Sequence, residues 1–177
     1  KENNRPRRIN KKLIYGFSKF QSTNYLLSEF KKNSFPVVVT RLYQVYGEKQ
    51  DVNRFIPIVI DACLKDKSFP CSECKQKRDF IYIDDLIDAL IKIIIKKSNI
   101  NGEIFNIGSE KAYQLKKIIS YIKKICRGGK PLYGKIKLRS DESLISYPLI
   151  GKAKKILKWY PKTNLYNGLK KTIRNYR

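Results

Sequence analysis

The chain has 177 residues, of which 42% are hydrophobic, and its 39 Lys and Arg residues against 15 Asp and Glu residues give a formal net charge of +24. This length allows one domain, or one domain with part of another, and can bury a sizeable core. No apolar run approaches the roughly 18 residues of a membrane span and no secretory signal is visible, so we expect a cytoplasmic protein without a membrane partner.

Helices and strands are expected to alternate along most of the chain, which favours an α/β fold. Apolar residues recur at helical spacing or in short β-branched runs, and Pro36 and Gly108 mark boundaries between elements. Residues 37–42 are apolar without alternation, as in a parallel strand that is covered on both faces. We expect helices at residues 17–32, 53–65, 84–97, 114–126, 152–158 and from 164 onward, and strands at residues 37–42, 78–83 and 104–107.

The start of the first helix carries a pair of residues suited to acid–base chemistry. Tyr15 and Lys19 are four residues apart, so they lie on one face of a helix, where the ammonium group favours the ionised phenol. The same spacing recurs elsewhere in this Lys-rich chain, but here Gly16 and Ser18 lie within the pair and a buried strand follows one helix later. Small neighbours leave room for a cofactor and a substrate, so we select Tyr15 as the candidate base.

The four Cys residues include one C-x-x-C pair, and the chain contains no His. A zinc site would need all four thiols, but two of them lie alone in apolar helical segments, so we expect no metal site. The pair does not open a helix after a strand, which disfavours a redox motif. We expect reduced thiols at Cys63, Cys71, Cys74 and Cys126.

Five motifs in a fixed order resemble the signatures of a known family. The chain reads YGFSK at residues 15–19, RLYQVYG at 41–47, RDFIYIDD at 78–85, FNIGS at 105–109 and LKWYPK at 157–162. These segments are similar to the Y-G-x-S-K, R-x-x-N-V-Y-G, R-D-F-x-Y-V-D-D, [YF]-N-[IV]-G-S and L-G-W-x-P-K motifs of the NAD-dependent epimerase/dehydratase family. That family is the extended branch of the short-chain dehydrogenase/reductases.

The resemblance covers nearly the whole chain and implies a division into four segments. The fold would be the C-terminal part of a Rossmann-like parallel sheet with a smaller α/β substrate-capping region. Residues 1–46 would end the dinucleotide-binding domain and carry the catalytic helix, and residues 47–78 would bind substrate. Residues 79–109 would be the returning helix and strand of the dinucleotide-binding domain, and residues 110–177 would complete the substrate-binding region.

The resemblance also implies roles at the cofactor end of the site. Tyr15 would take a proton from a sugar hydroxyl while hydride passes to NAD or NADP, and Lys19 would bind the nicotinamide ribose. Tyr43 and Val45, in the second motif, would also contact the cofactor.

At the other end of the site the resemblance implies a nucleotide-sugar substrate. Arg78 and Arg139 would hold its diphosphate, because a guanidinium offers a fork of donors to anionic oxygens. Asn53 would lie near the same diphosphate, at the positive end of a helix. Gln44, where the family usually has Asn, and Tyr147 would complete the substrate contacts.

Parts of the family pattern do not occur in these residues. No Gly-rich phosphate loop, G-x-x-G-x-x-G, is found, and the family's Ser or Thr that binds the reacting hydroxyl would precede Tyr15. The chain also begins at Lys1 and has no Met. We expect it to be the C-terminal part of a longer enzyme that is a homodimer at full length, and to be inactive as an isolated fragment.

Together these observations predict an NAD(P)-dependent sugar-nucleotide epimerase or dehydratase. The alternative is a non-catalytic relic, or a basic protein that binds polyanions through its charge. Lys residues are spread through every segment without a dense tract, so we expect no specific nucleic-acid partner.

Overall fold

The computed structural model describes residues 14–138 and 142–176. Helix and strand alternate as expected, and each expected helix or strand lies within a few residues of an observed element. The five short strands at residues 44–46, 68–70, 112–114, 130–132 and 145–146 were not expected. The elements are α1 (Ile14–Asn33), β1 (Val39–Leu42), β2 (Gln44–Tyr46), α2 (Phe55–Leu64), β3 (Ser68–Pro70), β4 (Lys77–Tyr82), α3 (Ile83–Lys96), η1 (Lys97–Ile100), β5 (Ile104–Ile107), β6 (Ala112–Gln114), α4 (Leu115–Cys126), β7 (Lys130–Leu132), β8 (Ile145–Ser146), η2 (Ala153–Leu157, a π-helical turn) and α5 (Leu165–Arg174).

The strand that was expected at residues 37–42 is observed as β1, and a second short strand, β2, follows it with a different partner. β1 pairs in parallel with β5, with Thr40 opposite Phe105, and β2 pairs in parallel with β4, with Val45 opposite Ile81. Tyr43 lies between them, and its N–H donates to the carbonyl of Ile107 at 3.2 Å, which extends the first ladder to the point of divergence. The chain therefore changes partner strands at Tyr43.

A group of shorter strands surrounds the start of β4. β6 pairs with β4 in an antiparallel manner, and β8 pairs with it in parallel, with Arg78 opposite Ser146. β3 and β7 form a separate parallel pair. The segment that carries β8 therefore returns from far along the chain to lie beside Arg78.

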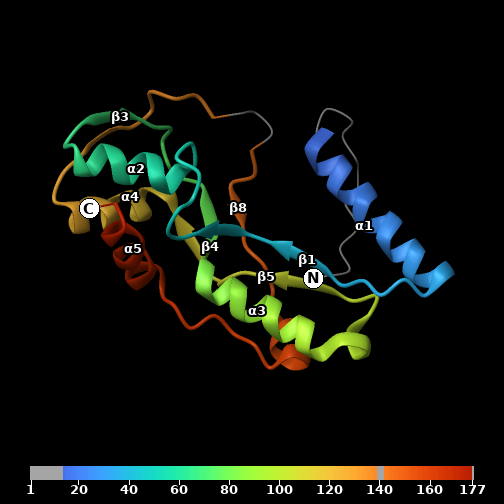
Figure 1. Cartoon of the computed structure of the whole chain (residues 1–177). Coiled ribbons are helices and arrows are strands. Elements are labelled where there is room, and N and C mark those ends of the chain that lie inside the picture. Colours follow the sequence, from blue (N-terminus) through green and yellow to red (C-terminus); the bar gives the residue numbers. More distant parts are fainter. Residues whose placement is uncertain (1–13, 139–141, 177) are drawn as a thin grey trace.

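The helices cover β4 from two sides and form two apolar clusters (Figure 1). In the first cluster α2, α4 and α5 pack over β2 and β4, with Phe80 and Tyr82 pointing into it. In the second, α3, β5 and η2 pack around Ile81. Successive side chains of a strand point to opposite faces, so β4 contributes to both clusters, as a strand covered on both faces must.

The last 20 or so residues are attached to the start of α3 by a buried carboxylate. Asp85 accepts hydrogen bonds from the backbone N–H groups of Lys162 and Thr163, both at 3.0 Å, and its carbonyl accepts one from the indole of Trp159 at 3.1 Å. Trp159 is 1% exposed. These bonds position η2 against α3 and lead the chain into α5.

α1 lies apart from both clusters, across the β1–β5 pair from α3 (Figure 1). None of its residues is buried by the described parts of the chain, and Ile14 and Tyr25 are 77% and 65% exposed. Within the described residues, no helix is long and apolar enough to cross a membrane.

Candidate active site

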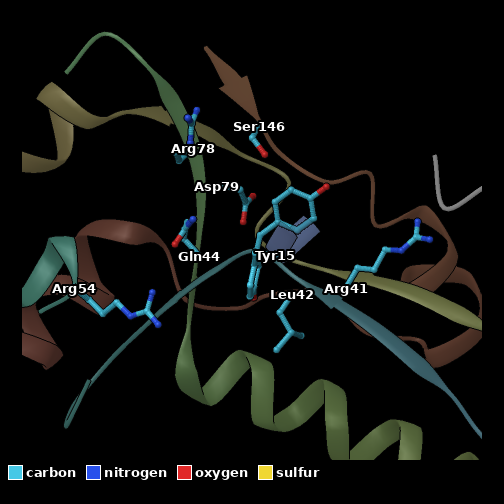
Figure 2. Close-up of a pocket in the computed structure, with 9 residues that line it drawn as sticks. Tyr15, Arg41, Leu42, Gln44, Arg54, Arg78, Asp79 and Ser146 are labelled. Carbon is cyan, nitrogen blue, oxygen red and sulfur yellow. The ribbon is translucent and has the colours of Figure 1, made fainter. Parts of the chain in front are cut away.

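A cavity of about 810 Å³ opens where the chain changes partner strands. Side chains from α1, β1, β2, β4, β8 and the loop before α2 meet there, and Figure 2 shows them arranged around the ring of Tyr15. The lining residues are Tyr15, Arg41, Leu42, Tyr43, Gln44, Arg54, Arg78, Asp79 and Ser146.

Tyr15 and Lys19 lie together on α1, as their spacing predicts. The Lys19 ammonium is 5.5 Å from the centre of the Tyr15 ring. Tyr15 is 76% exposed, so the described residues leave its phenol open to the cavity. A second cavity, of about 510 Å³, lies between α1 and β1 and is lined by both residues together with Ser22 and Thr23. Tyr15 therefore borders both cavities, whereas Lys19 lines only the second.

Arg78 is fixed at the mouth of the first cavity by three hydrogen bonds. Its Nη1 donates to the carbonyl of Lys77 at 2.8 Å, and its Nη2 donates to Glu142 Oε1 at 2.9 Å and to the carbonyl of Ser143 at 2.6 Å. The Arg78 side chain is only 14% exposed. The strand pairing of Arg78 with Ser146 brings this whole segment beside it.

Asp79 lies deeper in the same cavity and holds a loop together. Its carboxylate accepts hydrogen bonds from the N–H of Ser109 at 2.8 Å, the hydroxyl of Ser109 at 2.8 Å and the N–H of Lys111 at 2.9 Å. Burial raises the pKa of Asp79 above its ordinary value, while these hydrogen bonds act in the opposite direction. Asp79 thus fixes the turn after β5 beside the cavity.

The structure brings only some of the expected site residues together. Tyr15, Tyr43, Gln44 and Arg78 line the first cavity, and Lys19 lines the neighbouring one. The interpretation of Val45 as a cofactor contact gains no such support. Its side chain packs against the second apolar cluster, because it alternates with Gln44 along β2.

Two other expected residues, both described, lie outside the cavity lining. Asn53 is exposed and stands two residues before α2, so it is not in the first turn of the helix, where it was expected; its N–H donates to the Asp51 carboxylate at 2.9 Å. Tyr147 is 48% exposed and follows the lining residue Ser146. Arg139 lies outside the described residues.

Four residues of the lining that matter for charge or packing were missed in the sequence. Arg41 and Arg54 bring two further guanidinium groups, and Asp79 and Ser146 bring oxygen atoms. Arg41 and Asp79 stand within two of the five motifs, so the sequence carries a signal for both of them. Arg54 and Ser146 gave none, because a basic or polar residue in a loop is common in this composition.

A third cavity, of about 440 Å³, has mostly apolar walls from α2, β3 and the turn of Cys71 to Cys74. Cys71 and Cys74 are buried, and burial raises the pKa of the Cys71 thiol to about 11. Among the described residues, no group of three or more His, Cys, Asp or Glu side chains could hold a metal ion. Glu142 is also part of the lining of this cavity.

The parallel strand pairs β1–β5 and β2–β4, with a Tyr–Lys pair and three Arg side chains near the point where the chain passes from one to the other, are typical of the Rossmann-like fold of the short-chain dehydrogenase/reductase class. Residues 1–108 match the model of the NAD-dependent epimerase/dehydratase family, and the match ends within the fourth of the five motifs. The chain belongs to the NAD-dependent epimerase/dehydratase family. The expected family and fold class are thereby confirmed.

Similar proteins are sugar-nucleotide enzymes. A CDP-abequose synthase of Salmonella muenchen is 32% identical over 75% of this chain and 45% of its own length. A human dTDP-D-glucose 4,6-dehydratase is 31% identical over 92% of this chain and 48% of its own. The solved UDP-glucuronic acid 4-epimerase of Bacillus cereus, in complex with UDP-glucuronic acid and NAD, is 26% identical with a TM-score of 0.85, over 98% of this chain and 57% of its own. The chain spans about half the length of the curated relatives it matches.

Proposed function

We propose that the protein is part of an NAD-dependent epimerase or dehydratase that acts on a nucleotide sugar. One observation carries this proposal: the Tyr15 phenol opens onto a cavity that is also lined by Arg41, Arg54 and Arg78. A base and a set of guanidinium groups in one cavity suit a substrate that has a reacting hydroxyl at one end and a diphosphate at the other.

Tyr15 acts as the base in this proposal. Its phenolate takes the proton of a sugar hydroxyl, and the Lys19 ammonium, 5.5 Å from the ring centre, stabilises the negative charge on the phenolate oxygen. NAD, when bound, supplies the acceptor for the hydride that leaves the same sugar carbon. In an epimerisation the hydride returns to the keto carbon and Tyr15 returns the proton to its oxygen, so the pair serves both directions of transfer. In a dehydration the oxidised carbon remains a ketone, and Tyr15 acts there only as the base.

Residues on both sides of Tyr15 fit the two ligands. The cavity between α1 and β1 offers the Lys19 ammonium as a donor to the hydroxyls of a nicotinamide ribose. The Ser22 and Thr23 hydroxyls on the same wall donate to the carbonyls of Ser18 and Lys19, so their oxygen atoms are left to accept from the ribose. Tyr43, which lies between β1 and β2 where the chain changes partner strands, would contact the same cofactor.

Gln44 and Arg78, which line the same cavity as Tyr15, would hold the substrate, and Arg78 would bind its diphosphate. Asn53, Arg139 and Tyr147 remain proposed contacts of the nucleotide part, and a homodimer remains the proposed assembly. The names of similar proteins cover CDP-, dTDP- and UDP-linked sugars, so the proposal stays at nucleotide sugars as a class.

The test is the Tyr15→Phe substitution in the intact natural protein, assayed with NAD and with UDP-glucose, dTDP-glucose and CDP-glucose. Loss of the proton acceptor should lower turnover by at least about a hundredfold, with binding of the nucleotide nearly unchanged. Tyr166→Phe is a matched control, because Lys170 also lies four residues later and 5.0 Å from the Tyr166 ring centre, but on α5.

Normal turnover of the Tyr15→Phe protein would contradict the assignment of the base. Absence of turnover in the wild type with every sugar nucleotide and with either NAD or NADP would favour the non-catalytic alternative.

A further inference from the structure

Arg78 is held in place before any substrate arrives. Three hydrogen bonds fix its guanidinium group, and one of them is an ion pair with Glu142 at 2.9 Å. The two residues are 64 positions apart in the chain, and their side chains are 14% and 24% exposed. A pair of this kind is more than a surface contact, because both charged groups are largely removed from water.

Glu142 is itself held from a second direction. Its Oε1 also accepts a hydrogen bond from Gln76 Nε2 at 3.5 Å, and the same Nε2 lies 3.4 Å from the hydroxyl of Ser72. Gln76 is only 4% exposed. The backbone beside the pair is fixed as well, because the N–H of Lys77 donates to the carbonyl of Leu144 at 2.7 Å. Glu142 therefore accepts hydrogen bonds from both Arg78 and Gln76, so its carboxylate is held next to Arg78 by more than the ion pair alone.

The pair stands between two of the three cavities. Arg78 lines the cavity that contains Tyr15, and Glu142 lines the apolar cavity beside α2. A nucleotide sugar that reaches Tyr15 with its sugar has its diphosphate and nucleoside farther along the molecule. A cation at the border of the two cavities is suitably placed for the diphosphate.

We propose that Glu142 is a positioning residue that orients Arg78 for the diphosphate of the substrate. The inference rests on the proposed function, and it assigns to Glu142 an effect that acts through Arg78. A free Arg side chain has many rotamers and must lose them when it binds an anion, whereas one that is already fixed has less to lose. Glu142 therefore strengthens binding of the diphosphate although it carries a negative charge itself.

The negative charge of Glu142 and its hydrogen bond to Arg78 have opposite effects on the binding of an anion, so the two can be distinguished by experiment. If its charge dominated, removal of the carboxylate would strengthen binding of an anion. If its hold on Arg78 dominates, as we propose, removal weakens binding. Gln at this position can still accept the bond from Nη2 of Arg78, so Glu142→Gln should preserve the orientation.

The experiment measures binding of UDP, dTDP and CDP to the intact natural protein by titration calorimetry. For the nucleotide that binds wild type, Glu142→Ala should raise the dissociation constant by roughly fivefold to tenfold. The dissociation constant of Glu142→Gln should stay within about twofold of the wild-type value. Asp61→Ala is the matched control, because Asp61 forms an exposed ion pair with Lys65 at 2.5 Å on α2 and lines none of the three cavities.

A double substitution separates positioning from direct contact. Glu142→Ala should have no further effect in an Arg78→Ala background, because the residue acts through the guanidinium group. An additional loss in that background would show direct contact with the ligand and overturn the positioning role. So would tighter or unchanged binding by Glu142→Ala alone.

The same titrations distinguish this inference from the proposed function. If wild type binds none of the three nucleotides, the proposed substrate class is wrong and the inference falls with it. If wild type binds one of them and Arg78→Ala weakens that binding but Glu142→Ala does not, the proposed function stands and the inference alone is overturned.

Discussion

Single residues show both the strength and the weakness of motif-based prediction. The spacing of Tyr15 and Lys19 predicted a stacked pair, and the structure has it at 5.5 Å. The side chains that complete the cavity could not be predicted in this way, because Arg54 and Ser146 reach it through loop and strand geometry that no local pattern records. The catalytic role of Tyr15 and the binding roles of the other cavity residues stay predictions.

The backbone conformation of Lys158 reduces the stability of the fold, and this effect can be tested with a single substitution. Lys158 stands where the family motif has Gly, and it adopts φ of +51°, the left-handed conformation that disfavours residues with a Cβ. Lys158→Gly should therefore stabilise the protein by about 1 kcal/mol in thermal or denaturant unfolding. The bond from Lys92 Nζ to the carbonyl of residue 158 can remain, since it uses the backbone.

The matched change for this prediction is Lys155→Gly in the preceding helical turn, which should destabilise by about 0.5–1 kcal/mol because glycine weakens a helix interior. Equal effects of the two substitutions would contradict the conformational argument.

At the scale of elements, periodicity predicted α1 to α5 and the central strands well, and it missed strands of two or three residues. β3, β6, β7 and β8 have no periodic signal over such lengths, and their pairing depends on partners far along the chain. β2 and the change of partner at Tyr43 were also missed, because the apolar β-branched run ends before Gln44 and the strand was expected to end at residue 42.

Glu110 links the loop after β5 to the start of η2 and gives a prediction for acid stability. Its carboxylate contacts the Lys154 ammonium and accepts from the N–H of Ile150 at 3.3 Å, and the Lys154 contact lowers the pKa of Glu110. A lowered pKa in the folded state means that this contribution is present near neutral pH and is lost as the pH falls through the folded value.

Glu110→Gln should consequently reduce the free energy of unfolding near neutral pH, with a smaller difference from wild type at low pH. Denaturant melts between about pH 3 and pH 7 measure this. A difference that grows on acidification would contradict the assigned direction of the pKa shift.

At the scale of the whole molecule, the described residues leave extensive apolar surface uncovered. β1 is hydrogen-bonded to β5 alone among the described strands, and α1 buries none of its residues. On α3, Ile87, Ile91, Ile94 and Ile95 follow helical spacing along one side and are 46% to 71% exposed. Exposed edges and stripes of this kind promote association.

We therefore expect the 177 residues, expressed by themselves, to elute from a sizing column as species larger than a monomer. Replacing Ile91 and Ile95 with Lys should reduce this association, since it places charge in the middle of the stripe. A monodisperse monomer with one cooperative melting transition would contradict the expectation.

The change of partner strands at Tyr43 limits how well this stretch tolerates insertions and deletions. One continuous run of backbone sets the register of two ladders, β1 with β5 and β2 with β4. Inserting or deleting a single residue there would turn Gln44 inward and Val45 toward the solvent, or detach one ladder from its partner. Natural variation in this stretch should therefore occur by substitution, with insertions and deletions confined to the loops on either side.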